Sequence, residues 1–470
     1  MSVFLPVMLN SKFIFLLFLL LIVSGCARSP VNPPLHQYDP DAGYRLKNLV
    51  AKDNSQTLLV ILTFSGGGTR AAALSYGVLE ELARIETKWE GHTRRLLDEV
   101  DIIAGVSGGS FTAAYFGLYG DRIFFEFEDR FLKKNVQGAL TAKLFNPVNW
   151  VRLLSRHYGR SELAAKYYDK HLFHGATFND FLAVRGPLIS INATDMTLGG
   201  RFGFDQTHFD WLCSDLLRFP ISRAIAASSA VPVALSPVTM HNYAGSCGFR
   251  VPGDYERVLA TPDWGSRRYH AFRRMATYLD RANKPFLHLV DGGLSDNLGL
   301  RAIMESVILA GGAPEILQQR GLTEVRKVLF VVVNAQTEGD PSWDKRERVP
   351  SIMTMISILT KLPMNAHNFE TVSLLRANVS RWAKRIAEAR CAPEIIKQGR
   401  CELVEFFLVD VSFQALADEQ EREYLQRLPT KFKLPGEDVD RVRTAAALLL
   451  RESGDFQRFL RDLRLRPALP

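Results

Sequence analysis

VDIIAGVSGGSF, residues 100–111, contains the pattern that decides the fold of this 470-residue chain. Val100 to Ala104 has the apolar composition of a buried strand, and a helix of small and aromatic residues is expected from Phe111 to Tyr119. Between them, residues 105–109 form a G-x-S-x-G sequence at the strand-to-helix turn. Glycines permit strained backbone angles beside the serine, and the N-terminus of a helix favours negative charge. Ser107 is therefore predicted to be a nucleophile.

A second glycine-rich turn precedes this one. Gly66 to Gly68 follow the apolar run Leu58 to Phe64 (LLVILTF), which is typical of a strand buried on both faces of a parallel sheet. Amide N–H groups without neighbouring Cβ atoms suit either a phosphate cradle or an oxyanion hole. A P-loop lysine is absent, and Ala71 makes only a marginal dinucleotide fingerprint. Because the serine turn follows, we favour an oxyanion hole. Arg70 would hold this loop or bind substrate charge, and an exposed arginine is the alternative.

A third motif places a carboxylate after a strand. Asp291 follows the apolar stretch Phe286 to Val290 and is succeeded by Gly292 and Gly293. Open α/β sheets form their ligand crevices at the carboxyl ends of strands. A D-G-G sequence alone is more often a turn than a base. Together with the other two motifs, however, it makes Asp291 a candidate base.

The three motifs in this order resemble the patatin-like phospholipase family. The family pattern is G-G-G-x-[KR]-G, then G-x-S-x-G, then D-G-[GA], and the only departure is Ala71 at the last position of the first motif. Alanine is small, so we expect tighter packing there and an intact hole. The resemblance covers residues 58–300. It includes residues 187–202 (PLISINATDMTLGGRF) and 221–232 (ISRAIAASSAVP), which look like the family's strand and the helix behind its active site.

The resemblance implies a serine acyl hydrolase with a Ser-Asp dyad and no catalytic histidine. Asp291 would take the proton of Ser107, which attacks an ester carbonyl of a phospholipid or lysophospholipid, while Gly66 to Gly68 bind the oxyanion. Water then releases the acyl group. Desolvation would make Asp291 a stronger base. No metal and no organic cofactor are implied. The predicted site comprises Ser107, Asp291, Gly66, Gly67 and Gly68, supported by Arg70, Gly105, Gly109, Gly292 and Gly293.

The rest of the chain predicts a layered α/β domain. Apolar spacing from Ala71 to Trp89 predicts a helix. Further apolar runs predict strands at residues 188–192, 286–290, 328–334 and 404–411. Strands that alternate with helices indicate a mostly parallel central sheet flanked by helices, here of the patatin-like type. We assign residues 57–412 to this catalytic domain, with its motif core at 58–300, and residues 413–470 to a packed helical C-terminal extension.

The amino terminus predicts export. Phe13 to Val23 is an unbroken apolar run that is too short to span a bilayer. It ends in Val23-Ser24-Gly25-Cys26, which resembles a bacterial lipobox. The resemblance implies removal of residues 1–25 as a lipoprotein signal peptide and lipidation of Cys26, which would anchor the chain in a membrane. An uncleaved signal anchor is the alternative.

Residues 26–56 are proline-rich and are predicted to form a semi-extended tether between the lipid and the body. Alanine at position 27, where aspartate is the sorting exception, implies the outer membrane of a Gram-negative cell, on its periplasmic or surface side. Without Cys26, four cysteines remain. Local pairing, Cys213 with Cys247 and Cys391 with Cys401, is one of three possible connectivities in an oxidising compartment.

Composition and charge limit the class of protein and the binding partners that this chain fits. The chain has 47% hydrophobic and 23% charged residues, which excludes collagen-like, disordered and polytopic membrane proteins. Its net charge is +8, and its isoelectric point is about 9.2. Because only Lys12 is charged in the predicted signal peptide, this basic balance belongs to the exported body. Anionic lipid is the expected partner, whereas nucleic acid is not, since no recognition motif is present. No sequence pattern indicates an oligomeric state.

The sequence leaves two alternative functions. An α/β-hydrolase triad would need a histidine after Asp291, and only His367 follows it, in a segment that reads as a helix start. His288, inside an apolar stretch, is expected to be a core residue. The second alternative is a non-catalytic lipid-binding lipoprotein on a degenerate hydrolase fold. The intact motifs around Ser107 and Asp291 argue against it.

Overall fold

The computed structural model describes residues 31–49, 53–155, 157–338, 345, 347, 349, 351–399 and 401–465. The predicted signal peptide, residues 1–25, and the predicted lipidation site Cys26 lie outside these residues. Within the described ranges, no helix combines the length and the apolar character that crossing a bilayer would require.

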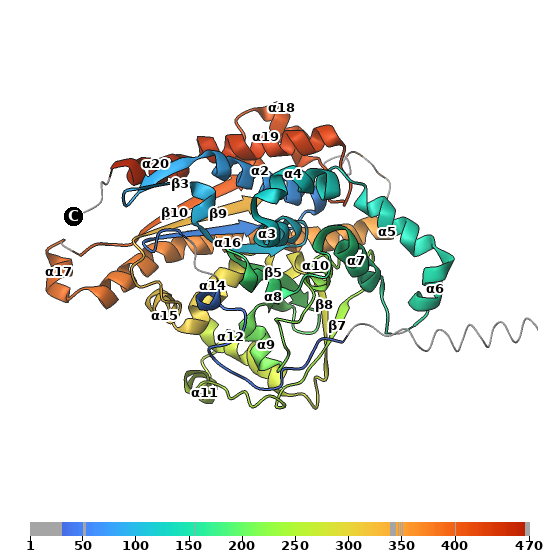
Figure 1. Ribbon diagram of the computed structural model, residues 1–470, viewed down its shortest axis with the longest axis horizontal. Coiled ribbons are helices and arrows are strands. Elements are labelled where there is room, and N and C mark those ends of the chain that lie inside the picture. Colours follow the sequence, from blue (N-terminus) through green and yellow to red (C-terminus); the bar gives the residue numbers. More distant parts are fainter. Residues whose placement is uncertain are drawn as a thin grey trace, which may run out of the picture.

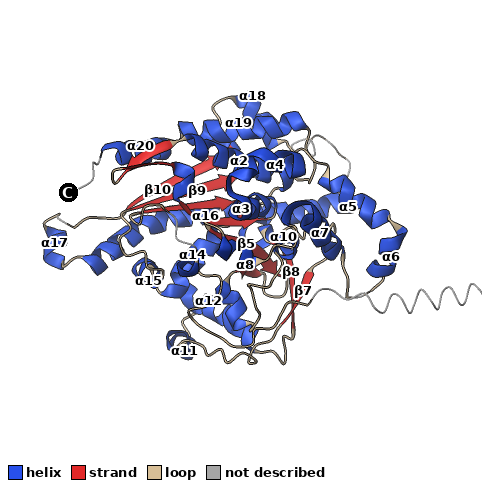
Figure 2. Cartoon of the chain, in the orientation of Figure 1, coloured by secondary structure: helices blue, strands red, loops and turns tan. Residues whose placement is uncertain are grey.

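A mixed central sheet lies between two layers of helices (Figure 1, Figure 2). The five strands from β10 to β5 run parallel to one another, whereas β6, β8 and β7 pair antiparallel to their neighbours. The described sheet therefore has the predicted α/β, mostly parallel form. In spatial order its strands are β10 (Glu405–Ser412), β9 (Lys327–Asn334), β1 (Leu58–Phe64), β4 (Val100–Val106), β5 (Leu188–Asp195), β8 (Phe286–Asp291) and β7 (Val238–His241), with β6 (Gly200–Phe204) beside β5.

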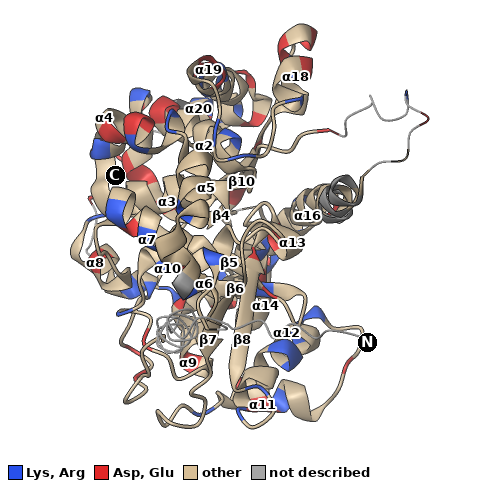
Figure 3. Ribbon diagram, turned by 90° about the vertical axis from the view of Figure 1, so that its right-hand side faces the viewer, with Lys and Arg blue, Asp and Glu red and all other residues tan. Residues whose placement is uncertain are grey.

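The central strand β1 contributes to a hydrophobic core on each face of the sheet. Every residue of β1 is buried, as the unbroken apolar run predicts. Val60 and Leu62 belong to the core that includes α2 (Gly68–Arg84), α3 (Gly108–Tyr119) and α10 (Ile221–Ser228). Leu59 and Ile61 belong to the opposite core, with α14 (Leu300–Ala310), α15 (Ala313–Gln319) and α16 (Ile352–Arg390). In Figure 3, charged residues mark the outer helices, while the strands carry few.

The sequence predicted most strands of the central sheet, but not all of them. All six predicted strands are present with nearly the predicted bounds, whereas β6 and β7 were not predicted. The helix predicted from Ala71 to Trp89 was wrong at its end. It stops at Arg84, and β2 (Glu86–Trp89) pairs with β3 (His92–Arg95) in a hairpin. Glu90 and Gly91, both with positive φ, form its two-residue turn, and β2 alternates exposed and buried residues in the period of a strand.

The C-terminal extension is helical, as predicted, and packs on helix α2 and strand β10. It contains α18 (Glu419–Gln426), α19 (Gly436–Glu452) and α20 (Gly454–Leu465). Helix α19 crosses α2 at Gly77, where an added Cβ would lie 2.7 Å from the Arg443 carbonyl oxygen and 2.8 Å from Ala446 Cβ. Arg443 Nη2 also donates to Glu80 of α2 over 2.8 Å. The extension therefore shares one hydrophobic core with the motif-bearing helices.

The proline-rich segment before the body is docked on it, which differs from the predicted tether. Asn32 Nδ2 donates to Ser214 Oγ (2.9 Å) and to the His241 carbonyl (3.0 Å), and the His241 amide donates to Asn32 Oδ1 (2.7 Å). Tyr44 is buried, and its hydroxyl accepts the Ile189 amide over 2.7 Å. These partners are far along the chain, so proline content gave no sign of them.

Two disulfides follow the local pairing. Cys213 is bonded to Cys247, and Cys391 is bonded to Cys401. The first lies beside the docked N-terminal segment, since the Leu35 amide donates to the Cys213 carbonyl and the Tyr38 amide donates to that of Cys247. The second closes the connection between α16 and β10.

The close crossing of α19 and α2 predicts a stability difference between two glycines. Gly77→Val should lower the free energy of unfolding by about 1–3 kcal/mol, because the new side chain overpacks against Arg443 and Ala446. Gly454→Val is the matched control, because a Cβ there meets no atom within 4 Å. Urea unfolding followed by circular dichroism measures both. Equal stability of the two variants would contradict a tight crossing.

Candidate active site

The register of three neighbouring strands brings the predicted nucleophile and base together. Val106, the last residue of β4, lies opposite Asn192 of β5. The next residue of β5, Ala193, lies opposite Asp291 at the end of β8. Ser107 follows Val106 directly. The serine and the aspartate therefore lie close together at one edge of the sheet, next to the end of β5, the strand between β4 and β8. The Ser107 hydroxyl donates to Asp291 Oδ2 over 2.9 Å.

Ser107 occupies a strained turn between β4 and α3. Its backbone angles, φ 45° and ψ −118°, are sparsely populated by residues other than glycine, and such strain is typical of functional sites. The Ser107 amide donates to Ser228 Oγ over 2.8 Å, which fixes the turn. Gly108 has no room for a side chain, because an added Cβ would lie 2.1 Å from the Gly68 carbonyl oxygen. The serine turn and the glycine loop are therefore in direct contact.

Asp291 is held in a dry environment by several fixed groups. It is 8% exposed and Ser107 is 5% exposed. Burial raises the pKa of Asp291 to about 6, while hydrogen bonds from the Gly293 amide (2.8 Å to Oδ1) and the Ser107 hydroxyl act in the opposite direction. A carboxylate with a pKa near 6 is ionised at neutral pH and is a stronger base than an exposed one. Thr194 Oγ1 donates to the Asp291 carbonyl over 2.8 Å and fixes its backbone.

The predicted oxyanion loop lies beside the serine, but the amides of its three glycines differ in their hydrogen bonding. The Gly66 amide donates to the Asn297 carbonyl over 2.9 Å, so this N–H is already engaged. Among the described residues Gly67 N–H has no acceptor, and Gly68 N–H, at the first position of α2, has none within its helix. An added Cβ on Gly66 would lie 3.4 Å from Ser107 Cβ. The amides of Gly67 and Gly68 are therefore the donors left for an oxyanion.

Arg70 connects this loop to the rest of the molecule. It is buried, and its guanidinium donates to the carbonyls of Ala335 (2.9 Å) and Leu428 and to Thr430 Oγ1 (3.1 Å). Burial lowers the pKa of Arg70 to about 10, so it stays charged at neutral pH. The Thr69 amide also donates to the Lys431 carbonyl over 2.9 Å. These contacts favour a role in holding the loop over one in binding substrate charge.

Several residues that shape the site were missed by sequence reasoning. Ser228 on α10 accepts the Ser107 amide and donates to the Asn192 carbonyl over 2.6 Å. Asn297 holds Gly66 through its carbonyl, and its buried Oδ1 has no hydrogen-bond partner among the described residues. Both residues lie in or just after the quoted motif stretches. Serine and asparagine are common in turns, so nothing in their local sequence marks them.

The two histidines considered for a triad lie elsewhere. His288 Nδ1 is hydrogen-bonded to Thr239 Oγ1 over 3.0 Å, between β8 and β7. His367 is exposed on α16. In the part of the chain that the structure describes, no histidine is hydrogen-bonded to Ser107 or Asp291.

Comparisons with known proteins identify one family and several similar folds. A sequence model of the patatin-like phospholipase family matches residues 62–304. No curated protein matches the sequence. Three similar solved structures are human GIVD cytosolic phospholipase A2 (14% identity, TM-score 0.44, 97% of this chain and 67% of that one), the same protein in complex with methyl gamma-linolenyl fluorophosphonate (14%, 0.42, 88% and 60%), and VipD from Legionella pneumophila (11%, 0.25, 89% and 71%).

The raised pKa of Asp291 predicts a pH-dependent gain in stability on neutralisation. The native pKa, about 6, exceeds the ordinary value of 3.8, so ionising Asp291 disfavours the folded state and wild type loses stability as pH rises from 4 to 6. Asp291→Asn removes this cost. We expect the variant to be more stable than wild type by about 2–3 kcal/mol at pH 8, with the difference shrinking towards pH 4.5.

Urea unfolding at pH 4.5, 6 and 8 measures this difference. Glu256→Gln, at an exposed position of α11 (Gly253–Ala260), is the control and should track wild type at each pH. A stability difference between Asp291→Asn and wild type that stays constant with pH would show that the carboxyl group is not desolvated.

Proposed function

Because the chain belongs to the patatin-like phospholipase family, a family of lipid acyl hydrolases, we propose that it cleaves acyl esters of phospholipids or lysophospholipids with a Ser107–Asp291 dyad. The observation that carries this proposal is the 2.9 Å hydrogen bond from the Ser107 hydroxyl to the buried Asp291 carboxylate. A serine needs a base within hydrogen-bond reach to become a nucleophile, and Asp291 is that base.

The first half of the reaction forms an acyl-enzyme. Asp291 accepts the hydroxyl proton as Ser107 Oγ attacks the ester carbonyl carbon. The oxygen of the tetrahedral intermediate takes the electron pair of the carbonyl and binds the amides of Gly67 and Gly68 at the N-terminus of α2. The intermediate then collapses. The ester C–O bond breaks, and the leaving alkoxide takes the proton from Asp291 to depart as an alcohol.

The second half releases the fatty acid. A water molecule gives a proton to Asp291 and attacks the acyl carbonyl, again through an oxyanion held by the same amides. When this intermediate collapses, Ser107 Oγ leaves and recovers the proton from Asp291. The bond from the Gly293 amide keeps Asp291 Oδ1 occupied, so Oδ2 is the oxygen that exchanges protons with serine and water.

We propose further that the mature chain is exported and anchored through lipidated Cys26, in the outer membrane of a Gram-negative cell. Disulfides, of which the described body has two, are typical of proteins in oxidising compartments. The docked segment is hydrogen-bonded to the body from Asn32 on. The residues between Cys26 and Asn32 reach at most ~20 Å when extended. Such a short connection would keep the site near the bilayer that carries the anchor.

Lipid product analysis tests the dyad. With vesicles of phosphatidylethanolamine and phosphatidylglycerol, wild type should release fatty acid, and Ser107→Ala and Asp291→Asn should each lose at least ~10³-fold in rate. His367→Ala is the control for a triad and should retain wild-type turnover. Equal rates in wild type and both dyad variants would disprove the mechanism. Loss of turnover in folded His367→Ala would favour a triad, and wild type that neither releases fatty acid nor reacts with a fluorophosphonate probe would favour a non-catalytic lipid-binding protein.

Labelling with palmitate tests the anchor. In a Gram-negative host, wild type should incorporate radiolabelled palmitate and sediment with outer membranes, because Cys26 is the predicted acceptor. Cys26→Ser should lose the label. The double variant Cys391→Ser/Cys401→Ser is the matched control, since it removes two other cysteines and should keep the label. A labelled Cys26→Ser protein would contradict anchoring at this residue.

A further inference from the structure

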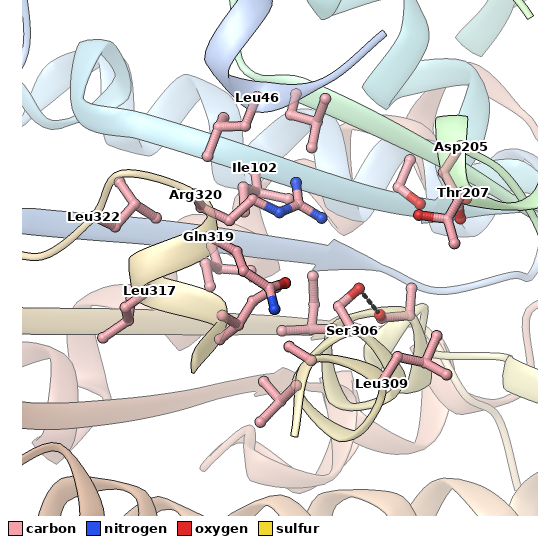
Figure 4. A pocket seen from close by; sticks show the side chains of 18 of the residues that line it. Leu46, Ile102, Asp205, Thr207, Ser306, Leu309, Leu317, Gln319, Arg320 and Leu322 are labelled. Atoms are coloured by element: carbon pink, nitrogen blue, oxygen red, sulfur yellow. Dashed lines mark hydrogen bonds between the residues drawn. The ribbon is translucent and has the colours of Figure 1, made fainter. Parts of the chain in front are cut away.

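A second site is suggested by a cavity of about 340 Å³ on the face of the sheet covered by α14 and α15 (Figure 4). The sheet side is formed by residues at the beginnings of parallel strands, such as Leu59 of β1, Ile102 of β4 and Leu188 of β5. The helix side includes Ile303 and Val307 of α14. The volume is near the lower end of the ~300–1,000 Å³ typical of small-molecule sites.

This cavity is separate from the candidate active site. Parallel strands begin at one end of a sheet and finish at the other, and Ser107 and Gly66 follow the finishing ends of β4 and β1. Ile102 of β4 and Ser107, which follows β4, are five residues apart, which is roughly 16 Å at ~3.3 Å per residue. Neither Ser107 nor Asp291 lines the cavity.

The apolar walls of the cavity are incompletely covered. Ile102, Leu188, Ile303 and Val307 are each only half-buried, although they lie between the sheet and its helix layer. Interiors of proteins are normally packed to the density of organic crystals, and an apolar void forfeits dispersion contacts. These walls therefore suit the hydrocarbon portion of a ligand.

A guanidinium points into this apolar space. Arg320 follows the last residue of α15, and its side chain extends towards the middle of the cavity (Figure 4). Among the described residues its side chain has no hydrogen-bond partner and no carboxylate within ion-pair distance. The nearby Asp205 is already engaged by His208 Nδ1 at 2.9 Å and by Arg201 at 3.5 Å.

The surroundings compensate the charge of Arg320 only in part. Desolvation lowers the pKa of Arg320, the neighbouring charge of Arg45 lowers it further, and Asp205 acts in the opposite direction. Arg45 itself is paired with Asp210 at 2.6 Å. Arg320 is half-buried, and a partly desolvated cation without an ion-paired partner is stabilised when an anion binds it. A guanidinium is also well suited to a carboxylate or a phosphate, which it can bind through two parallel hydrogen bonds.

The cavity has a polar mouth. Gln319 and Lys47 line it and are exposed, so it opens towards solvent near the end of α15. Deeper inside, the hydroxyl of Ser306 is already used, since it donates to the Ala302 carbonyl over 2.9 Å (Figure 4). Among the described residues that line the cavity, Arg320 is thus a cation without an ion-paired partner, and much of the remaining wall is apolar.

We propose that this cavity binds a single-chain anionic amphiphile, with its carboxylate or phosphate paired to Arg320 and its hydrocarbon chain between the sheet and α14. A free fatty acid and a lysophospholipid both have this chemistry. The proposal goes beyond the hydrolysis at Ser107 and stands without it, because binding here requires no bond to be made or broken.

Binding measurements on the Ser107→Ala protein test the proposal without interference from turnover. Isothermal titration calorimetry is carried out with palmitate, with 1-palmitoyl lysophosphatidylglycerol and with hexadecanol, each below its critical aggregation concentration or solubility limit. At least one of the two anions should bind, and Arg320→Gln should weaken that binding by ~10- to 100-fold. Hexadecanol should bind more weakly than that anion and should be unaffected by Arg320→Gln. The anion that binds more tightly identifies the headgroup as carboxylate or phosphate.

Two controls keep the result interpretable. Arg461→Gln removes an exposed arginine of α20 and should leave binding unchanged. Thermal unfolding shows whether Arg320→Gln is folded; its melting temperature without ligand should equal or exceed that of the parent, because a partly desolvated charge without an ion-paired partner is lost. Palmitate or the lysophospholipid should then raise the melting temperature of the parent and not that of Arg320→Gln. Binding that Arg320→Gln does not weaken, or no binding of either anion, would overturn the proposal.

Discussion

The contact between two glycine turns is the constraint on which the site depends. Strands β1 and β4 are parallel neighbours, so the turns that follow them meet at one edge of the sheet. At Gly108 the second turn passes the Gly68 carbonyl so closely that any side chain would collide with it. A Cβ added at Gly108, the residue after Ser107, would also lie 2.8 Å from the Gly68 amide nitrogen, so this amide is close to the serine turn. The strained backbone of Ser107 is the local cost of that arrangement.

The C-terminal extension stabilises the same edge from outside. Arg70 is buried and donates to Leu428 and Thr430, while the Thr69 amide donates to Lys431. Each of these partners belongs to the segment that connects α18 and α19. Because α19 is also packed tightly on α2, the predicted oxyanion loop is held between its own helix and the extension. The extension is therefore a structural part of the candidate site, although no motif lies in it.

Features that depend on a local sequence pattern could be predicted, whereas contacts between residues far apart in the sequence could not. The apolar runs of the parallel strands and the spacing of the motifs are local, so the sheet and the meeting of Ser107 with Asp291 could be predicted. The docking of Asn32 on His241 joins residues 209 positions apart, and no local signal announces it. The hydrogen bond from the Gly66 amide to Asn297 also joins residues far apart in the sequence. The sequence therefore predicted three amide donors, whereas the Gly66 amide already has an acceptor in the described structure.

A partly desolvated charged side chain lies at each end of the sheet, Asp291 at one end and Arg320 at the other. Neither Asp291 nor Arg320 has an ion-paired partner among the described residues, and desolvation opposes the charge of both. A carboxylate relieves the penalty by taking up a proton near pH 6, and that same exchange is what a general base requires. An arginine cannot lose its proton at physiological pH. A bound anion would offset its desolvation, so the arginine without an ion-paired partner indicates a ligand, whereas the carboxylate with a raised pKa indicates proton transfer.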